Sequence, residues 1–389
     1  MGGGLPDLVY ALPDGLTEAQ AGAVADRLGY GSEVITGLQL DRGRLLVWLR
    51  AEADGARLTT LIRQLVEEVS AEGVRASETI RRTEPARPAP GSGQGNADPA
   101  VAARLHRLYD RMFLDLALEI GARERVYPSM IELAVMDRCR YVAQFPQNAY
   151  LVDELPHDRD LLGRLRSGET DRESGRRSTP YLLNPALCFH VYAELADRRI
   201  EETVLLTMSG RCFRHEAPWR LDGYRLADFT MREIPYVGPP REVAGLRQQL
   251  LERTWELFVE LGFTGRIETA TDPFYHAEDA DLGKYQLLSK AKYELIVETP
   301  QGATAAVASF NNLRDSLCRQ FDITAPGGAQ AHSGCAAFGI DRWVRATLDQ
   351  HGADPAAWPQ RLKRYDERAA DTSISSSRNT NRSMSDVDR

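Results

Sequence analysis

No apolar run in the 389-residue sequence approaches the ~20 residues that a membrane-spanning helix needs. The first residues also lack the basic segment and the apolar core of a secretory signal peptide. Only five cysteines occur, and this odd number without CxxC spacing does not predict a disulfide framework. Together these absences predict a cytoplasmic protein with reduced thiols and no membrane contact.

An excess of positive charge is missing as well. The formal net charge is −8, whereas a protein that binds nucleic acid over a broad surface is usually basic. This net charge describes the whole chain and leaves open whether a local basic patch exists. A hydrophobic content of 43% and a charged content of 27% are ordinary for a globular protein. The length suffices for one large domain and one small domain.

A stretch rich in proline, glycine and serine, residues 83–99, predicts a linker because it offers nothing from which to build a core. It separates a small domain, residues 1–82, from a main domain, residues 100–368. The polar residues 369–389 predict a disordered tail.

The small domain is predicted to have the element order βαββα, which is typical of a small α+β fold. A capping box marks its first helix, with Thr17 as N-cap and Gln20 three residues later. No catalytic constellation occurs in it, so a docking role and a merely stabilising role both stay open. The predicted elements are strands at 8–12, 33–40 and 44–50, with a turn at Asp41-Arg42-Gly43, and helices at 17–28 and 56–70.

The central feature of the main domain is a predicted hairpin that carries charged residues. Its two strands, residues 204–216 and 226–237, alternate apolar and polar side chains. Arg214 and Glu216 are predicted to share one face of the first strand. An arginine fork suits a phosphate, and an aromatic ring such as Phe229 on the second strand suits a purine. A solvated, charged hairpin is the alternative interpretation.

The order of these residues, Arg-x-Glu, a loop and Phe-x-x-x-Glu, resembles motif 2 of class II aminoacyl-tRNA synthetases, above all the seryl type. The resemblance implies that Arg214 grips the α-phosphate of ATP, that Glu216 contacts the adenine end and that Phe229 stacks on adenine. Residues 334–348 resemble motif 3, in which Arg342 would bind the terminal phosphates. The implied fold is α+β, a class II synthetase-like antiparallel sheet flanked by helices.

The beginning of the main domain resembles motif 1 of the same family. A predicted helix at 100–121 leads to a strand with Pro128 and then to Phe145-Pro146. In the family, motif 1 builds the dimer interface, so the resemblance implies a homodimer. A second long amphipathic helix is predicted at 241–263.

Three residues far apart in the sequence, Cys188, Glu233 and Cys335, resemble the zinc ligands of two relatives. These are the methanogen-type seryl enzymes and the bacterial amino acid:carrier protein ligases. Three protein ligands leave a fourth tetrahedral position open, which a neutral substrate amine can fill. The other cysteines, Cys139, Cys212 and Cys318, are interpreted as packing residues.

Substrate contacts are expected on the strands that follow. Lys292 and Glu294 occupy the strand after motif 2, where the family's acid helps to bind the substrate amino group. Ser309 and Asn311 lie on a buried strand at 305–312 and are predicted to contact substrate. The seryl-type enzymes carry a metal-binding Glu where this chain has Ala306, so how Mg²⁺ is held stays open.

The two kinds of relative, seryl-tRNA synthetases and amino acid:carrier protein ligases, differ in the molecule that accepts the activated amino acid. The small domain shows no sustained heptads, unlike the tRNA-gripping coiled coil of a seryl-tRNA synthetase. Asn184-Pro185-Ala186 stands where seryl enzymes have Thr-x-Glu. The pattern looks most like the amino acid:carrier protein ligases, which implies that ATP activates a small amino acid, glycine or alanine, for transfer to the phosphopantetheine thiol of a carrier protein. Transfer to tRNA is not expected, but it stays open, as does a non-catalytic regulatory paralogue.

Overall fold

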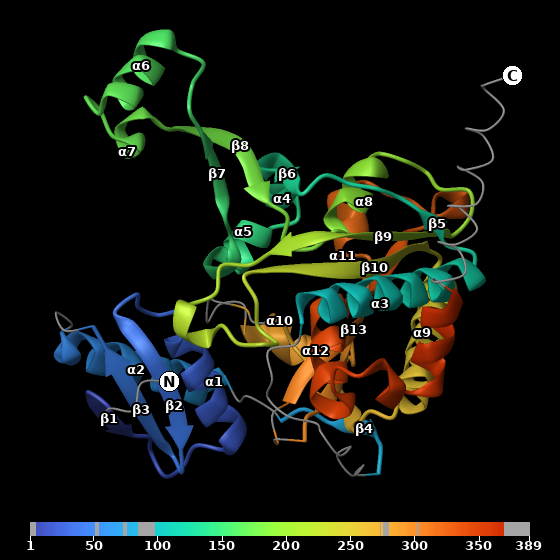
Figure 1. Cartoon of the computed structure of the whole chain (residues 1–389), viewed down its shortest axis with the longest axis horizontal. Helices are drawn as coiled ribbons and strands as arrows, with labels where there is room; N and C mark the ends of the chain where they lie inside the picture. The colour runs from blue at the N-terminus through green and yellow to red at the C-terminus, as the bar shows by residue number, and fades with distance from the viewer. Residues whose placement is uncertain are drawn as a thin grey trace, which may run out of the picture.

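The computed structural model describes residues 5–50, 54–72, 76–84, 98–272, 274, 280–300, 302 and 304–368. The predicted tail at 369–389 and most of the predicted linker lie outside these ranges. A central eight-stranded sheet organises the main domain, and a small domain lies beside it (Figure 1).

The central sheet is antiparallel except at one edge, where β5 pairs in parallel with β9. The long strands at its centre, which are buried or partly buried over most of their length, follow from runs of β-branched, aromatic and small residues. The sheet confirms the predicted fold. In spatial order its strands are β4 (Thr79–Arg82), β11 (Gly265–Thr269), β12 (Lys292–Glu298), β13 (Thr304–Arg314), β14 (His332–Gly339), β10 (Asp228–Gly238), β9 (Val204–Phe213) and β5 (Arg123–Glu124).

Helices cover both faces of the sheet, and each face has its own core. Neighbouring strand residues belong to different cores: Leu205 packs with one cluster and Leu206 with the other, as the period of two requires. In the first cluster, the rings of Phe113 and Phe338 stack with their centroids 4.3 Å apart. The helices of the first face are α3 (Pro99–Glu119), α9 (Pro240–Glu260) and α12 (Ile340–His351); those of the second are α4 (Leu133–Arg138), α8 (Phe189–Glu194) and α11 (Ser316–Gln320).

The small domain has the predicted βαββα order. Thr17 and Gln20 form the predicted capping box at the start of its first helix. Arg42 and Gly43 turn the hairpin with φ of 45° and 76°, the positive values that a tight two-residue turn needs. The elements are β1 (Leu8–Ala11), α1 (Glu18–Leu28), β2 (Ile35–Asp41), β3 (Arg44–Leu49) and α2 (Gly55–Glu72), with the sheet order β1-β3-β2.

Residues 79–82 do not follow the predicted domain assignment. The sequence predicts them as part of the small domain, but as β4 they form an edge of the large sheet by pairing with β11. Arg81 fixes the strand further, because its guanidinium lies 2.7 Å from Glu252 of α9. The chain is therefore tied to the main domain before the predicted linker begins.

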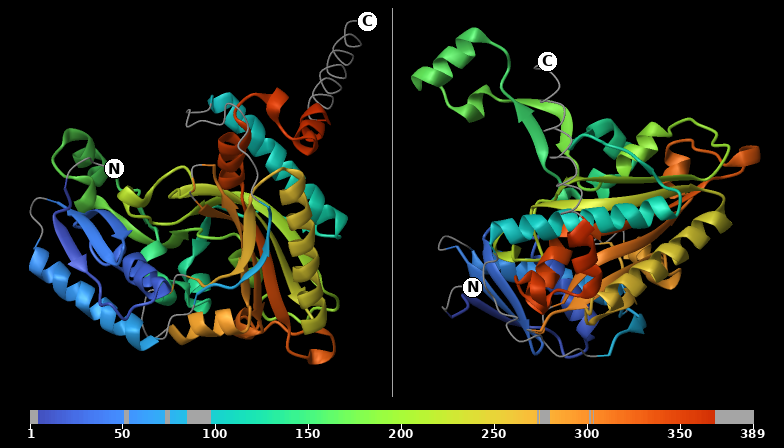
Figure 2. Two further views of the ribbon diagram at one scale, coloured as in Figure 1. Left: turned by 90° about the horizontal axis from the view of Figure 1, so that it is seen from below. Right: turned by 45° about the vertical axis from the view of Figure 1, so that its right-hand side comes forward.

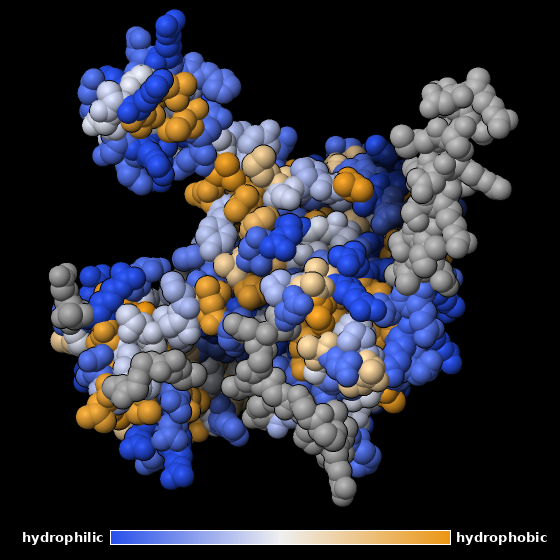
Figure 3. Space-filling view, in the orientation of Figure 1, coloured by the Kyte–Doolittle hydropathy of each residue, from blue (hydrophilic) through white to orange (hydrophobic). Residues whose placement is uncertain are grey.

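An arm projects from the main domain. Its sheet has the order β6-β8-β7, and its outer end carries two short helices that stand clear of the body (Figures 1 and 3). Across the described ranges, no helix has both the length and the apolar character to cross a membrane. The remaining elements are β6 (Met130–Glu132), α5 (Tyr141–Gln144), β7 (Leu151–Glu154), α6 (Arg159–Ser167), α7 (Arg172–Gly175), β8 (Arg177–Leu183) and α10 (Ala280–Leu288).

Candidate active site

The register of four central strands gathers most of the predicted site residues on one face of the sheet. One row runs across the strands as Glu294, Ser309, Ala337 and Glu233. Because residues two apart share a face, the row two positions away lies on the same side. That second row contains Lys292, Asn311, Cys335 and Pro235.

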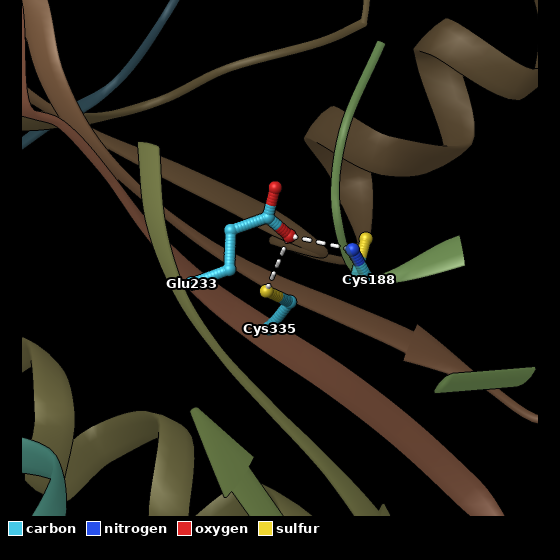
Figure 4. A group of neighbouring side chains, drawn as sticks. All are labelled: Cys188, Glu233 and Cys335. Atoms are coloured by element: carbon cyan, nitrogen blue, oxygen red, sulfur yellow. Dashed lines mark hydrogen bonds between the residues drawn. The ribbon is translucent and has the colours of Figure 1, made fainter. Parts of the chain in front are cut away.

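The two cysteines and the glutamate predicted as metal ligands converge (Figure 4). Their ligand atoms all lie within 4.8 Å of one another. Cys335 Sγ is 3.4 Å from Glu233 Oε2, and the backbone N–H groups of Leu187 and Cys188 donate to the two Glu233 oxygens at 2.8 and 3.1 Å. The carboxylate is thus fixed by backbone donors at the start of α8.

The donors of this cluster suit zinc. Two thiols and a carboxylate are among its usual ligands, and three of them leave one tetrahedral position free. Glu233 and Cys335 are buried, and burial raises the pKa of the Cys335 thiol. Such thiols give up their protons when a metal binds. The residues present therefore fit the metal that the resemblance implies.

A group of arginines forms the cationic part of the site. Burial, with the neighbouring Arg214 and Arg225, lowers the pKa of Arg342 to about 10. The Arg342 side chain is held by two backbone carbonyls, donating from Nε to Tyr224 at 2.6 Å and from Nη1 to Ala306 at 2.7 Å. Several partly buried cations held close together attract a polyanion such as a triphosphate.

Arg214 and Glu216 lie beyond the end of their strand, so the prediction that both are strand residues is wrong. Strand β9 ends at Phe213. The N–H of His215 donates to the carbonyl of Asn148 at 3.1 Å rather than to the partner strand, and this turns the chain away. Arg214 still reaches Phe229 of β10, with its guanidinium carbon 5.3 Å from the ring centroid.

Lys292 forms a partly buried ionic group with two acids. Its Nζ lies 2.7 Å from Asp272 and 3.1 Å from Glu294. Burial alone lowers the pKa of Lys292, but the two carboxylates raise it above its usual value. Burial likewise works to raise the pKa of Asp272, yet the Lys292 ammonium holds it below its usual range. Both groups are therefore charged at neutral pH.

Three residues at this site were not predicted as functional: Asp272, Arg225 and Tyr30. Asp272 carries no motif spacing relative to Lys292, and only the fold brings the two together. Arg225 binds both oxygens of Glu216 at 3.1 Å, and its place in the charged loop of the hairpin was a usable signal. Tyr30 comes from the small domain, and no local pattern indicates its contact with Glu216.

The cysteines assigned to packing are consistent with that interpretation. Cys139, Cys212 and Cys318 are free and buried, and all three belong to the core on the second face of the sheet. The two that join the metal cluster are the pair that the resemblance selects.

The sheet, the arginine group and the two rows of site residues define a class II synthetase-like catalytic domain. Residues 167–351 match the family model of the tRNA synthetase class II core domain (G, H, P, S and T). Amino acid--[acyl-carrier-protein] ligase 2 of Bradyrhizobium diazoefficiens is 30% identical over 240 residues, which is 60% of this chain and 71% of that protein. Ligase 1 of the same organism is 29% identical over 252 residues, 63% of this chain and 76% of that protein.

The type-2 serine--tRNA ligase of Methanopyrus kandleri is 29% identical over 319 residues, 75% of this chain. The match spans about 60% of that longer relative. The chain belongs to the family of class II synthetase homologues that includes the amino acid--[acyl-carrier-protein] ligases and the type-2 seryl-tRNA ligases.

Solved structures show the same fold. The M. kandleri seryl-tRNA synthetase, crystallised with tRNASec of A. aeolicus, has a TM-score of 0.66 at 23% identity, covering 92% of this chain and 77% of its own. The seryl-tRNA synthetase of Pyrococcus horikoshii, crystallised with ATP, has a TM-score of 0.57 at 17% identity, covering 80% of this chain and 81% of its own.

Proposed function

We propose that the protein uses ATP to activate a small amino acid and transfers it to the phosphopantetheine thiol of a carrier protein. The observation that supports this most is the continuity of the site. The Lys292 group lies beside the arginines, since Asp272 interacts with Arg214 and Glu294 with Arg342. On its other side Asn311 donates toward the Cys335 carbonyl, at 3.5 Å, beside the metal ligands. One surface thus joins a polyanion site to an amine site.

In the first step, the carboxylate of the amino acid attacks the α-phosphorus of ATP, and the bond to the β-phosphate oxygen breaks to release pyrophosphate. Arg214 is assigned to the α-phosphate, Arg342 to the terminal phosphates and Phe229 to the face of adenine. Glu216 is assigned to the amino edge of the base. Mg²⁺ would bind the phosphate oxygens of ATP, because it is a hard cation that prefers oxygen ligands. The arginines stabilise the charge of the transition state.

The substrate amine is assigned to the cluster of Cys188, Glu233 and Cys335. Zinc held there supplies a Lewis-acidic fourth position that accepts a neutral amine. The family resemblance implies that zinc leaves little room around the α-carbon of the bound amino acid, and here backbone donors fix Glu233 while Asn311 adjoins Cys335. We therefore propose glycine or alanine as the substrate.

In the second step, the thiol sulfur attacks the carbonyl carbon of the adenylate, the bond to the phosphate oxygen breaks, and AMP leaves as the thiol loses its proton. A carrier protein is favoured because ligases 1 and 2 of B. diazoefficiens carry that acceptor in their names, and the matches span 76% and 71% of their lengths. The described residues of the small domain also form no long coiled coil, since their two helices are 11 and 18 residues long. A homodimer through the motif 1 segment belongs to the same proposal.

Transfer to tRNA is the second candidate, because the M. kandleri relative is a serine--tRNA ligase that matches 75% of this chain. One experiment separates the two. The purified chain is incubated with ATP and a labelled amino acid, with either a phosphopantetheinylated carrier protein, the same carrier without phosphopantetheine, or total tRNA. We expect label only on the phosphopantetheinylated carrier, unaffected by ribonuclease and released by hydroxylamine. Ribonuclease-sensitive labelling of tRNA alone would contradict the proposal.

A further inference from the structure

The loop between β9 and β10 contacts the small domain (Figures 1 and 2). Trp219, in the short helix η2 (Pro218–Arg220), packs against the core of that domain. Arg220 forms an ion pair with Asp26, with 2.9 Å between Nη2 and Oδ1. A Cβ added to Gly29 would lie 2.8 Å from Arg220 Nη1, so the loop lies tightly against the backbone at this position.

Tyr30 follows the C-cap of α1, and its side chain reaches from the small domain to Glu216. Its hydroxyl lies 3.0 Å from Glu216 Oε2, and the Arg220 guanidinium covers its ring with 4.6 Å to the centroid. Burial raises the pKa of Tyr30; Arg220 opposes this shift and the Glu216 carboxylate adds to it. The hydroxyl therefore stays protonated and donates its hydrogen to Glu216.

The hydrogen bond from Tyr30 matters because the Glu216 carboxylate can accept only a limited number of hydrogen bonds. A carboxylate offers about four lone-pair positions. Arg225 Nη1 donates to both oxygens at 3.1 Å, and Tyr30 donates to Oε2. Among the described residues, these donors fill Oε2 and leave one position on Oε1. The Glu216 side chain is 9% exposed and is held by Arg225 and Tyr30, so the carboxylate has little freedom to rotate and the free position on Oε1 keeps its direction.

We propose that Tyr30 is a positioning residue for nucleotide selection: it occupies Glu216 Oε2 so that Oε1 faces the exocyclic amino group of adenine. The docked small domain thereby sets the preference for ATP over GTP, since guanine presents a carbonyl oxygen where adenine presents the amino group. This inference rests on the proposed ATP site. It gives the small domain a role in the first half-reaction rather than in acceptor recognition alone.

Tyr30→Phe tests the inference because it removes one hydroxyl and keeps the ring under Arg220. Amino-acid-dependent ATP–pyrophosphate exchange is measured with ATP and with GTP for the full chain, for Tyr30→Phe and for the matched control Tyr10→Phe in the same domain. We expect Tyr30→Phe to raise the KM for ATP roughly tenfold with kcat changed less than about twofold. Its preference for ATP over GTP should fall by roughly the same factor, while Tyr10→Phe matches the parent chain.

A parent chain that exchanges normally, with an unchanged ATP preference in Tyr30→Phe, would overturn this inference and leave the proposed function intact. A parent chain that exchanges with no amino acid would count against the proposed function instead. In that case calorimetric titration of ATP and GTP into both proteins decides the inference. A reduced preference in Tyr30→Phe supports it, and an equal preference, or no nucleotide binding by the parent chain, refutes it.

Discussion

Cys335 Sγ lies 3.4 Å from Glu233 Oε2, although the two residues are 102 positions apart in the chain. They meet because β14 pairs with β10 in a register that sets Cys335 opposite Pro235, two residues from Glu233. Residues diagonal to each other on one face of a sheet are within reach of their side chains. The cluster is therefore a product of sheet register, with Cys188 added from the start of α8.

Replacing Cys335 should remove the metal. In Cys335→Ser the hydroxyl is a far weaker zinc ligand than a thiolate, so we expect zinc content to fall from about one per chain to near zero. Mass spectrometry of the purified proteins measures it. Cys318→Ala, in the core outside the cluster, is the matched control and should keep its zinc. A Cys335→Ser protein with full zinc and full activity would refute the assignment.

Replacing Arg214 should stop adenylate formation without unfolding the protein. Loss of one donor to a developing charge typically costs about 10²–10³ in rate, and we expect Arg214→Ala to lose at least that much pyrophosphate exchange. The control is Arg211→Ala, because Arg211 lies in β9, three residues before Arg214, but pairs at the surface with Asp228. Both variants should keep the parent's circular dichroism. Normal exchange by Arg214→Ala would rule out its phosphate role.

The ion pair of Lys292 and Asp272 should make stability depend on pH at the acid side. The pKa of Asp272 is lowered in the folded protein, so its contribution is present at neutral pH and is lost as the pH falls below about 4 through the folded-state pKa. We expect Asp272→Asn to lower the free energy of unfolding by on the order of 2 kcal/mol at pH 7.

Urea titrations between pH 3 and pH 7 check this expectation. The difference between Asp272→Asn and the parent chain should shrink steadily towards the acid end. Asp281→Asn provides the control, because Asp281 is exposed and its pair with Lys284 contributes little. A difference for Asp272→Asn that does not vary with pH would show that the residue acts through packing alone.

Much of this architecture could be predicted from the sequence, because the hydrophobic periodicity of a long segment indicates whether it forms a helix or a strand. The helix predicted at 100–121, the two hairpin strands and the capping box at Thr17 follow from local spacing. The structure has all of them, although the helix is Pro99–Glu119 and the first hairpin strand ends at Phe213 rather than at residue 216. The convergence of Cys188, Glu233 and Cys335 was predictable only through the family resemblance, since no spacing links Cys188 to Cys335.

What could not be predicted depends on tertiary contacts. Strand β4 is four residues long, largely exposed and rich in arginine, so nothing in it indicates a place in the large sheet. The end of β9 is set by the bond from His215 to Asn148, which lies 67 residues earlier in the chain. Tyr30 and Asp272 reach the site only because separate parts of the chain pack together.

Amino-acid-dependent ATP–pyrophosphate exchange across all twenty amino acids, with zinc measured on the same preparation, tests the central claim most directly. We predict exchange with one small amino acid, glycine or alanine, and about one zinc per chain. Absence of exchange with every amino acid from a folded, zinc-loaded protein would contradict it.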